Sequence, residues 1–383
     1  MKNSSDSGKS KETKRRGPDN GSSPRLLARI RAQLSTVIPP GVIILLLIGL
    51  VFLVFNPPVI SPAAKDKKIV ERLITISEDK SFHFGQDENY IFNSPARLEV
   101  AGENIYVLDS LDHRLRIFDL NGKFVRSIGQ RGKGPVEFNH PQGLFIDPVK
   151  EKIYVADTRN LRIQILNLEG KEISTHQLTF PPVAVAVLKD KLLVAAFPSN
   201  ALIMKDELLI RIYNSDFNQI GAFLKPVKAS DPSVNLLANQ FVIKKDRLDQ
   251  LVCARQFCLN EIQVYDETGR LSHRFEIIYK AANLASPGID IMIKNDLDVQ
   301  KIAYFVGDVA FDSQNNYYFL AGNTGLKSDG LPERGREIYK YNCQGEYLGT
   351  ILLPEKAVLI SFGPDDSLYL LDSNYTLRKF KIG

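Results

Sequence analysis

The chain has 383 residues, 44% of them hydrophobic, which is enough apolar content for a large buried core. Residues 1–36 contain nine Lys/Arg and three Asp/Glu, and the rest of the chain contains 40 Lys/Arg and 41 Asp/Glu. Because this remainder is close to neutral, it lacks the basic excess that nucleic-acid binding requires, and we expect no nucleic-acid partner.

Residues 1–37 are predicted to form a disordered, basic cytoplasmic tail. The first 24 residues are rich in Ser, Gly, Lys and Asn and have almost no apolar side chains to bury. Residues 25–34 carry arginines beside leucines. This stretch can either lie along a membrane surface or remain a solvated juxtamembrane segment.

Residues 38–56 are predicted to be a transmembrane signal anchor. Residues 38–55 contain no charge and, with Val37 and Val59 at the edges, approach the ~20 residues that cross a bilayer. The alternative is a cleaved signal peptide. The long polar start and the lack of a small-x-small cleavage site directly after Phe55 favour the uncleaved anchor.

The charges around this segment predict its orientation. Arg25, Arg29 and Arg31 precede it, and positive residues favour the cytoplasmic side. We therefore expect a single-pass protein of the cell membrane with a cytoplasmic N-terminus. Residues 57–68 are predicted to be a linker, and residues 69–383 to lie outside the cytoplasm, which means the periplasm in a bacterium.

A pattern of short strands recurs along residues 69–383. Residues 105–109 (IYVLD) recur as 153–157 (IYVAD), 48 residues later, and 121–123 recur as 169–171 at the same interval. The runs are rich in β-branched and aromatic residues and end at turn residues. A period in the range of roughly 40–50 residues, made of short strands, is typical of β-propeller blades.

Six repeats can be counted from this pattern. Their second strands are predicted at residues 105–108, 153–156, 192–195, 251–254, 317–320 and 368–371. Their third strands are predicted at residues 115–118, 162–166, 209–213, 262–265, 338–341 and 376–380. The last repeat lacks one strand, and residues 69–76 form a spare strand near the N-terminus. We expect the spare strand to pair with the strand that ends at Phe380 and so close the ring.

One repeat carries a longer motif, Gly-x-Gly-x-x-x-Phe-x-x-Pro-x-Gly-Leu, followed by Asp and by Ile-Tyr-Val-Ala-Asp-Thr-x-Asn-x-Arg-Ile. The matching residues are Gly132, Gly134, Phe138, Pro141, Gly143, Leu144, Asp147, 153–158, Asn160, Arg162 and Ile163. This motif resembles the NHL repeat. The resemblance implies an all-β fold, a six-bladed NHL-like β-propeller at residues 69–383 that binds other molecules at its loop faces, here preceded by a single transmembrane helix.

Extra residues widen the spacing between repeats in the middle of the chain, at 199–207, 225–238 and 279–303. Insertions in a regular array are usually loops on one rim, often the binding rim. The third insertion is long enough for a short helix.

Five residues are candidates for ligand binding: Arg97, His140, Gln142, Asp157 and Arg159. Three of them, Arg97, Gln142 and Arg159, lie on segments that should reach the loop face or the central channel. His140 precedes Pro141 and should lie near the channel mouth.

Asp157 also belongs to a repeated pattern. Asp109 and Asp157 occupy equivalent positions, as do Arg114 and Arg162. These residues form either a ring that faces a ligand or a repeated ion pair that holds the loop of each blade. We favour the ion pair.

The sequence can be compared with two kinds of metal site that occur in propellers. In the lyases related to NHL-like propellers, the metal-binding histidines follow the proline that opens an innermost strand, and the matching residues here are Ala96, Gln142 and Val183. A catalytic zinc is therefore not expected. Asp308 and Asn323 resemble the calcium ligands of lactonase-type propellers, but Asp and Asn are also ordinary turn residues. We expect no cofactor.

Cys253 and Cys258 are five residues apart. They can bridge a hairpin in an oxidising compartment or remain two semi-buried thiols, and the sequence does not choose between these alternatives.

The leading functional hypothesis is a membrane-anchored, extracytoplasmic binding or scaffolding module that is not an enzyme. Its partners would be a protein, a peptide or a glycan at a loop face, because a rigid disc of loops loses little entropy on binding. The alternative is a metal-dependent propeller enzyme of the lactonase or lyase type.

Overall fold

The computed structural model describes residues 72–199, 202–203, 205, 207–228, 232–257, 259–277, 306–326 and 332–383. The predicted tail, signal anchor and linker (1–37, 38–56 and 57–68) lie outside these residues, and so does the insertion predicted at 279–303. Within the described ranges, no helix is long and apolar enough to cross a membrane.

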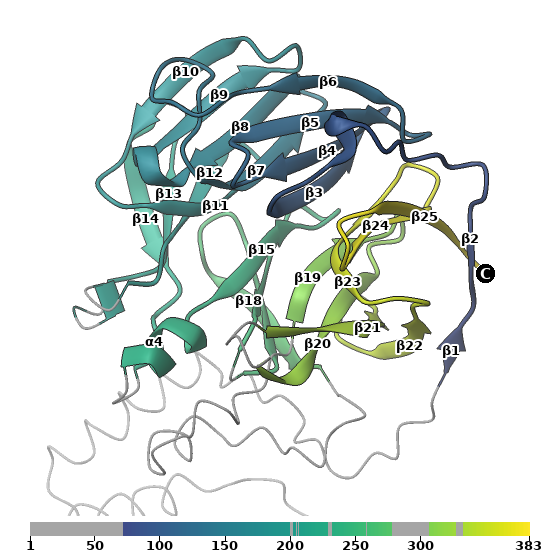
Figure 1. The fold of residues 1–383 in the computed structure, drawn as a ribbon. Coiled ribbons are helices and arrows are strands. Elements are labelled where there is room, and N and C mark those ends of the chain that lie inside the picture. The colour runs from purple at the N-terminus through teal and green to yellow at the C-terminus, as the bar shows by residue number, and fades with distance from the viewer. Residues whose placement is uncertain are drawn as a thin grey trace, which may run out of the picture. The chain divides into compact units, whose positions relative to one another are not determined.

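The described residues form six sheets, which are the predicted blades (Figure 1). Blades 1 and 2 contain β3 (Pro95–Ala101), β4 (Asn104–Asp109), β5 (Arg114–Asp119) and β6 (Phe124–Ile128), then β7 (Pro141–Asp147), β8 (Lys152–Asp157), β9 (Arg162–Asn167) and β10 (Glu172–Gln177). Blades 3 and 4 contain β11 (Pro182–Leu188), β12 (Lys191–Ala196), β13 (Ile210–Tyr213) and β14 (Gln219–Phe223), then β15 (Phe241–Lys245), β16 (Leu251–Arg255), β17 (Glu261–Tyr265) and β18 (Leu271–Glu276).

Blades 5 and 6 each take an additional strand from the N-terminal end of the propeller. Blade 5 contains β19 (Val306–Phe311), β20 (Tyr317–Leu326), β21 (Pro332–Tyr341), β22 (Tyr347–Leu352) and β1 (Leu73–Ile74), and blade 6 contains β23 (Ala357–Phe362), β24 (Leu368–Asp372), β25 (Leu377–Ile382) and β2 (Ile76–Glu78). The described parts of the connections include the short helices η1 (Glu88–Tyr90), η2 (Thr158–Asn160) and α4 (Pro232–Ala238). Every predicted second and third strand is present.

The first strand of each blade lies innermost. β3, β7, β11, β15, β19 and β23 each contact the first strands of both neighbouring blades, so the six blades close around a centre (Figure 1). Residues on inner strands are covered by neighbours on both faces, and all of β24 is buried. Outer strands are covered less, and β10 alternates between exposed and half-buried residues. The fold is therefore an all-β, six-bladed propeller.

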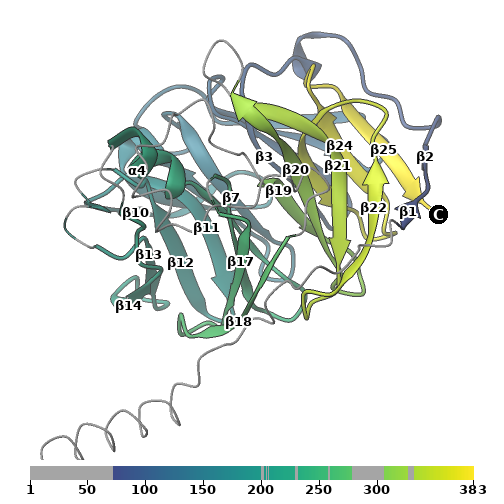
Figure 2. The same ribbon diagram turned by 90° about the horizontal axis from the view of Figure 1, so that it is seen from below.

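The ring is closed differently from the single spare strand predicted at residues 69–76. β2 pairs antiparallel with β25, with Ile76 opposite Ile382 and Glu78 opposite Phe380, so the closure itself is confirmed (Figure 2). β1, however, pairs parallel with β22 of blade 5, with Leu73 opposite Thr350. The chain changes blades at Thr75, and this places both Ile74 and Ile76 against the core cluster shared by blades 5 and 6.

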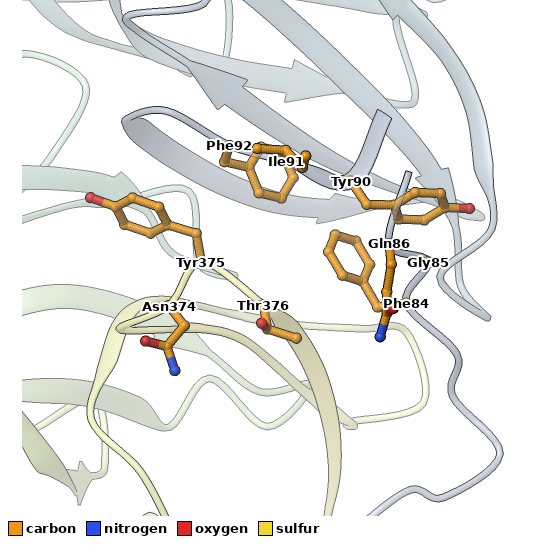
Figure 3. A pocket seen from close by; sticks show the side chains of 9 residues that line it. All are labelled: Phe84, Gly85, Gln86, Tyr90, Ile91, Phe92, Asn374, Tyr375 and Thr376. Carbon is orange, nitrogen blue, oxygen red and sulfur yellow. The ribbon is translucent and has the colours of Figure 1, made fainter. Parts of the chain in front are cut away.

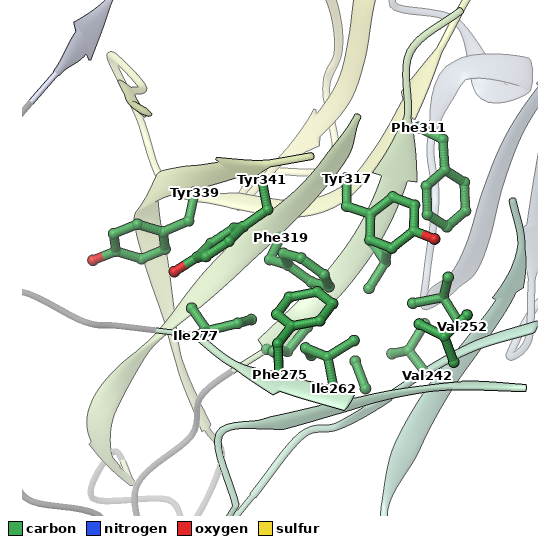
Figure 4. Packing of buried hydrophobic residues seen from close by; sticks show 14 of the residues in the cluster. Val242, Val252, Ile262, Phe275, Ile277, Phe311, Tyr317, Phe319, Tyr339 and Tyr341 are labelled. Carbon is green, nitrogen blue, oxygen red and sulfur yellow. The ribbon is translucent and has the colours of Figure 1, made fainter. Parts of the chain in front are cut away.

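Most of the core lies between adjacent blades. In Figure 4, Phe275 of blade 4 packs against Phe319 and Tyr341 of blade 5, with ring centroids 6.0 and 5.7 Å apart. Phe319 and Tyr317 are completely buried there. Burying one such side chain contributes about 1.5–3 kcal/mol. Because this burial needs two blades, a single blade cannot retain its fold alone.

The strand order gives the ring two different faces. One face, which we call the short-turn face, carries the turns between first and second strands at residues 102–103, 148–151, 189–190, 246–250, 312–316 and 363–367. Neighbouring turns are hydrogen-bonded to each other: Ser313 donates to Asp366 at 2.6 Å, and Lys150 contacts Asp190 at 2.9 Å.

The opposite face, which we call the long-loop face, carries the connections between second and third strands and between successive blades. Strand connectivity places there residues 197–209, residues 224–240 with α4, and both ends of the segment that joins β18 to β19. These are the connections that contain the three predicted insertions, so the extra residues are all connected to one face.

Candidate ligand-binding face

All five candidate residues are attached to strand ends at the long-loop face. Arg97 lies near the start of β3, Gln142 near the start of β7, and His140 directly before β7. Asp157 ends β8, and Arg159 lies in η2 immediately after it. The structure brings His140 and Arg159 close together, whereas Arg97 belongs to a separate cluster in the central channel.

Asp157 holds a loop in place. It is completely buried, and its carboxylate accepts hydrogen bonds from the Asn139 backbone at 2.6 Å and from Nε of Arg162 at 2.8 Å. Arg162 in turn donates to the carbonyl oxygens of Lys133, Gly134 and Glu137, each at 2.8 Å. This buried pair therefore fixes the connection at residues 129–140, as the ion-pair interpretation predicted.

Blade 1 contains a related pair with a different arginine. Strand register places Arg114 opposite Asp109, as Arg162 lies opposite Asp157. The buried ion pair is nevertheless made by Arg116, whose Nη1 lies 3.3 Å from Asp109, while Arg114 is exposed and reaches only Asp112 at 3.8 Å. Residues two apart on a strand point to the same face, so either arginine can reach the same carboxylate. The predicted role of Arg114 is therefore wrong, and Arg116 has it.

A cluster of basic and imidazole side chains lies beside the connection at 129–140. We call His113, Arg131, His140 and Arg159 the rim cluster. The His140 backbone N–H donates to Nδ1 of His113 at 3.0 Å, and the two imidazole rings lie 5.7 Å apart and nearly perpendicular. The Arg159 backbone donates to Asn139 at 3.0 Å, and Arg131 forms a β-bridge with Phe138. Four positively charged or ionisable groups from three connections therefore meet at one place.

The environment of this cluster disfavours protonation of its histidines. Partial burial, followed by the charges of Arg131 and Arg159, lowers the pKa of His113, although Asp112 opposes the shift. Partial burial and the charge of Arg159 likewise lower the pKa of His140. Both imidazoles are therefore neutral near pH 7, and the positive charge of the cluster comes from its two arginines.

The central channel holds a second cluster, which we call the channel cluster: Arg97, Glu99, Lys244 and Asp308. Lys244 Nζ lies 3.3 Å from Glu99 and 3.6 Å from Asp308, and the Lys244 and Asp308 side chains are 8% and 2% exposed. Arg97 donates to the backbone carbonyls of Ala96 and Val183 at 2.7 and 3.2 Å. Burial raises the pKa of Glu99 and lowers that of Arg97. Burial also acts to lower the pKa of Lys244, but the carboxylates of Asp308 and Glu99 outweigh it and raise that pKa.

The channel cluster bears on the suggested calcium site. One oxygen of Asp308 lies near the Lys244 ammonium, and the other accepts the Ile360 backbone N–H at 3.0 Å. A side-chain ammonium thus stands beside the carboxylate that would bind the ion, so Asp308 does not fit a calcium ligand here. The side chain of Asn323 lies outside the described part of the chain. Among the described residues, no group of three His, Cys, Asp or Glu side chains is arranged to hold a metal ion.

A groove of about 270 Å³ opens where the segment before β3 meets the β24–β25 connection (Figure 3). Phe84, Tyr90 and Phe92 line one side, and Asn374 and Tyr375 the other. The Phe84 and Tyr90 rings are 4.9 Å apart and perpendicular. Both walls come from connections at the long-loop face. Aromatic walls with nearby amides suit a ligand that has both apolar and hydrogen-bonding surfaces.

Sequence reasoning missed four of the residues that form these sites. Lys244 and Glu99 were missed although both are charged residues within innermost strands, where a charge has to find a partner. His113 and Arg131 were missed because they become neighbours of His140 only through the fold. Cys253 is a buried free thiol whose pKa burial raises to about 12, and its predicted alternative partner, Cys258, lies outside the described residues.

Comparison with known proteins places this architecture in a family. Residues 86–320, more than half of the chain, match the model described as a domain of unknown function, DUF4934. The chain belongs to the DUF4934 family. The sequence matches no curated protein significantly.

Solved structures share the fold at low sequence identity. A DUF4221 family member from Bacteroides vulgatus has a TM-score of 0.58 and 16% identity, over 82% of this chain and 99% of that chain. A protein from Bacteroides fragilis has a TM-score of 0.57 and 15% identity, over 82% and 96% of the two chains. At these identities the similarity shows that this DUF4934 protein shares their fold. It does not indicate an activity. The NHL resemblance stays a prediction.

Proposed function

We propose that this protein is a membrane-anchored binding or scaffolding module that acts without catalysis and presents its long-loop face to a protein, peptide or glycan. One observation carries the proposal. The long-loop face combines an open groove with arginines that have no acidic partner among the described residues, whereas the charges of the channel cluster neutralise each other. The groups available to a ligand are therefore on the face and not in the channel.

The rigidity of the ring supports this role. The blades are joined by shared apolar clusters and by ties between neighbouring turns, such as the bond from Arg247 to Asn315 at 2.8 Å. A rigid surface loses little conformational entropy when it binds, so more of the contact energy becomes affinity. Anchoring rests on the sequence alone, through the uncharged residues 38–55 and the arginines before them.

The proposal can be tested by screening the full chain in detergent against glycan and peptide arrays. Ile91 lines the groove and is 60% exposed, so Ile91→Asp should abolish binding without unfolding the protein. Val149, 90% exposed on the short-turn face, provides the matched control, and Val149→Asp should leave binding unchanged. The proposal fails if both variants lose binding equally or if neither does.

The competing hypothesis is a metal-dependent enzyme of the lactonase or lyase type. Its test is the metal content of the purified protein with and without chelator. We expect chelation to leave the thermal midpoint unchanged. A stoichiometric bound ion, together with a stability that chelator reduces, would favour the enzyme instead.

A further inference from the structure

We propose that the rim cluster is a binding subsite for a tetrahedral oxyanion, a sulfate or phosphate group on the ligand. This inference deepens the proposed function and rests on it, because it names the chemistry that one part of the long-loop face recognises. It follows from how the cluster is held, which of its hydrogen-bonding groups are free, and how its charge is balanced.

The cluster is built on a fixed segment. Gly129 has φ +94, and a side chain there would meet the fully buried Phe138 ring, so the connection turns tightly at its start. The buried Asp157–Arg162 pair then holds residues 133–139 through hydrogen bonds to their backbone. His113 and Arg159 are hydrogen-bonded to residues 139–140 through a ring nitrogen and a backbone N–H, and the residues on either side of Arg131 are hydrogen-bonded to Phe138. The backbone that carries the cluster is therefore fixed before any ligand arrives, which lowers the cost of binding.

The hydrogen bonds within the cluster determine which ring nitrogens remain available. Nδ1 of His113 accepts the His140 N–H, so in the neutral ring the proton is on Nε2, which has no partner among the described residues. Nδ1 of His140 lies 3.3 Å from Oγ of Ser110, which leaves its Nε2 for a ligand. The guanidinium groups of Arg131 and Arg159 are likewise without a hydrogen bond or ion pair to any described residue.

The acidic residues nearby are already engaged. Arg116 contacts both Asp112 and Asp109, and Asp109 also accepts the backbone N–H groups of Asn93 and Ser94 at 2.7 and 2.9 Å. The charges of Arg131 and Arg159 therefore remain uncompensated within the described structure. A concentration of positive charge with free N–H donors attracts an anion and holds it by charge-assisted hydrogen bonds.

The shape of the cluster favours a tetrahedral anion over a carboxylate. The two imidazole planes differ by 80°, so donors approach from directions that do not share a plane. The acceptor lone pairs of a carboxylate lie in one plane, whereas the oxygens of sulfate or phosphate do not. We therefore expect acetate to bind much more weakly than sulfate or phosphate.

The test is calorimetric titration of the full chain in detergent with sodium sulfate, sodium phosphate and sodium acetate, each at the same ionic strength. We expect saturable binding of sulfate or phosphate, and about tenfold or weaker binding of acetate. The double variant Arg131→Ala/Arg159→Ala should lose at least about tenfold in affinity, because it removes two charge-assisted donors.

A matched control removes the same charge elsewhere. Lys123 and Lys171 are exposed residues of turns on the short-turn face, so Lys123→Ala/Lys171→Ala should bind the anions as wild type does. Equal losses in both double variants, or no saturation in wild type, would overturn the inference. Array binding that survives while the anions fail to bind would overturn the inference and leave the proposed function standing. A preference for phosphate or for sulfate identifies the source of the group.

Discussion

The channel cluster and the rim cluster each consist of four side chains, but they use charge in opposite ways. The channel cluster contains two acids and two bases, and its charges are paired or bonded to backbone carbonyls. The rim cluster contains no acid, and its two arginines are exposed. The difference shows that charge is used for structure where it is buried and neutralised, and is available for recognition where it is exposed and unbalanced.

The largest expected effect is on the channel cluster. Lys244→Met leaves the buried Asp308 and the half-buried Glu99 without their nearest cation, and breaking a buried ion pair such as Lys244–Asp308 costs about 3–5 kcal/mol. Urea denaturation should show that loss as a lower midpoint. Adding Glu99→Gln to Lys244→Met should recover part of it, because one uncompensated charge is removed.

An exposed ion pair provides the control for this measurement. Lys150 lies 2.9 Å from Asp190, but the two side chains are 41% and 87% exposed. Lys150→Met should cost less than about 1 kcal/mol, because solvent screens exposed pairs. If Lys244→Met costs no more than Lys150→Met, the channel cluster does not stabilise the fold and the comparison fails.

A middle-sized effect is expected at the pair that supports the rim cluster. Asp157→Asn removes the negative charge beside the buried Arg162 and weakens its hydrogen bonds, which should cost about 2 kcal/mol. Asp190→Asn, the same change at an exposed residue, should cost almost nothing. Thermal and urea unfolding of the two variants make the comparison. A loss at Asp157 as small as at Asp190 would mean that Arg162 holds the connection through its carbonyl contacts alone.

The strands could be predicted from the sequence because their signal is local. Runs such as residues 153–156 and 368–371 are short, apolar and followed by turn residues, and this suffices to place second and third strands. The break at Thr75 could not be predicted, since residues 69–76 read as one continuous strand. Which blade each half joins is decided by the packing of Ile74 and Ile76 between blades 5 and 6.

Site residues could be predicted only where the local sequence around a single residue indicates its place in the fold. Arg97 was predicted to reach the loop face or the central channel because of the segment on which it lies, and Asp308 was considered only as a residue that resembles a calcium ligand. Lys244 ends an apolar run, Phe-Val-Ile-Lys-Lys, and reads as an ordinary polar end of a strand. Its partners lie on strands more than 60 residues away in the chain, and no spacing rule links them. The wrong prediction of Arg114 in place of Arg116 has a similar reason. The two residues lie two apart on one strand and face the same side, so the strand pattern does not indicate which of them pairs with Asp109.

Acidification should change the stability contributions of the two clusters in opposite directions, and we expect these changes to be smaller than that of Asp157→Asn. The folded-state pKa of His113 and of His140 is lowered from 6.5, first by burial, so the unfolded chain takes up protons before the folded one does. Their contribution to stability is therefore present above pH 6.5 and lost as the pH falls from 6.5 towards the folded pKa. Glu99 works in the opposite direction. Its folded-state pKa is raised from 4.5 by burial, so its contribution to stability is present below pH 4.5 and is lost as the pH rises from 4.5 through the folded-state pKa.

Variants can resolve these opposing contributions. His113→Asn keeps a residue that tolerates the φ of 56° at this position but does not titrate, and it should make stability depend less steeply on pH below 6.5. Glu99→Gln should make that dependence steeper. Urea midpoints measured across the acidic range give both slopes, and slopes that change in the same direction would contradict the assignment of the two clusters.

The smallest expected effect on stability belongs to the rim arginines. Arg131 and Arg159 are exposed and have no ion-pair partner among the described residues, so Arg131→Ala/Arg159→Ala should change the free energy of unfolding by less than about 0.5 kcal/mol. A small gain is equally compatible, because two like charges near one another repel. The same double variant is the one expected to lose anion binding, so a normal unfolding curve makes that loss a property of the site. If the variant is instead destabilised as much as Lys244→Met, the rim arginines stabilise the fold. The two clusters would then not differ in the use of their charges.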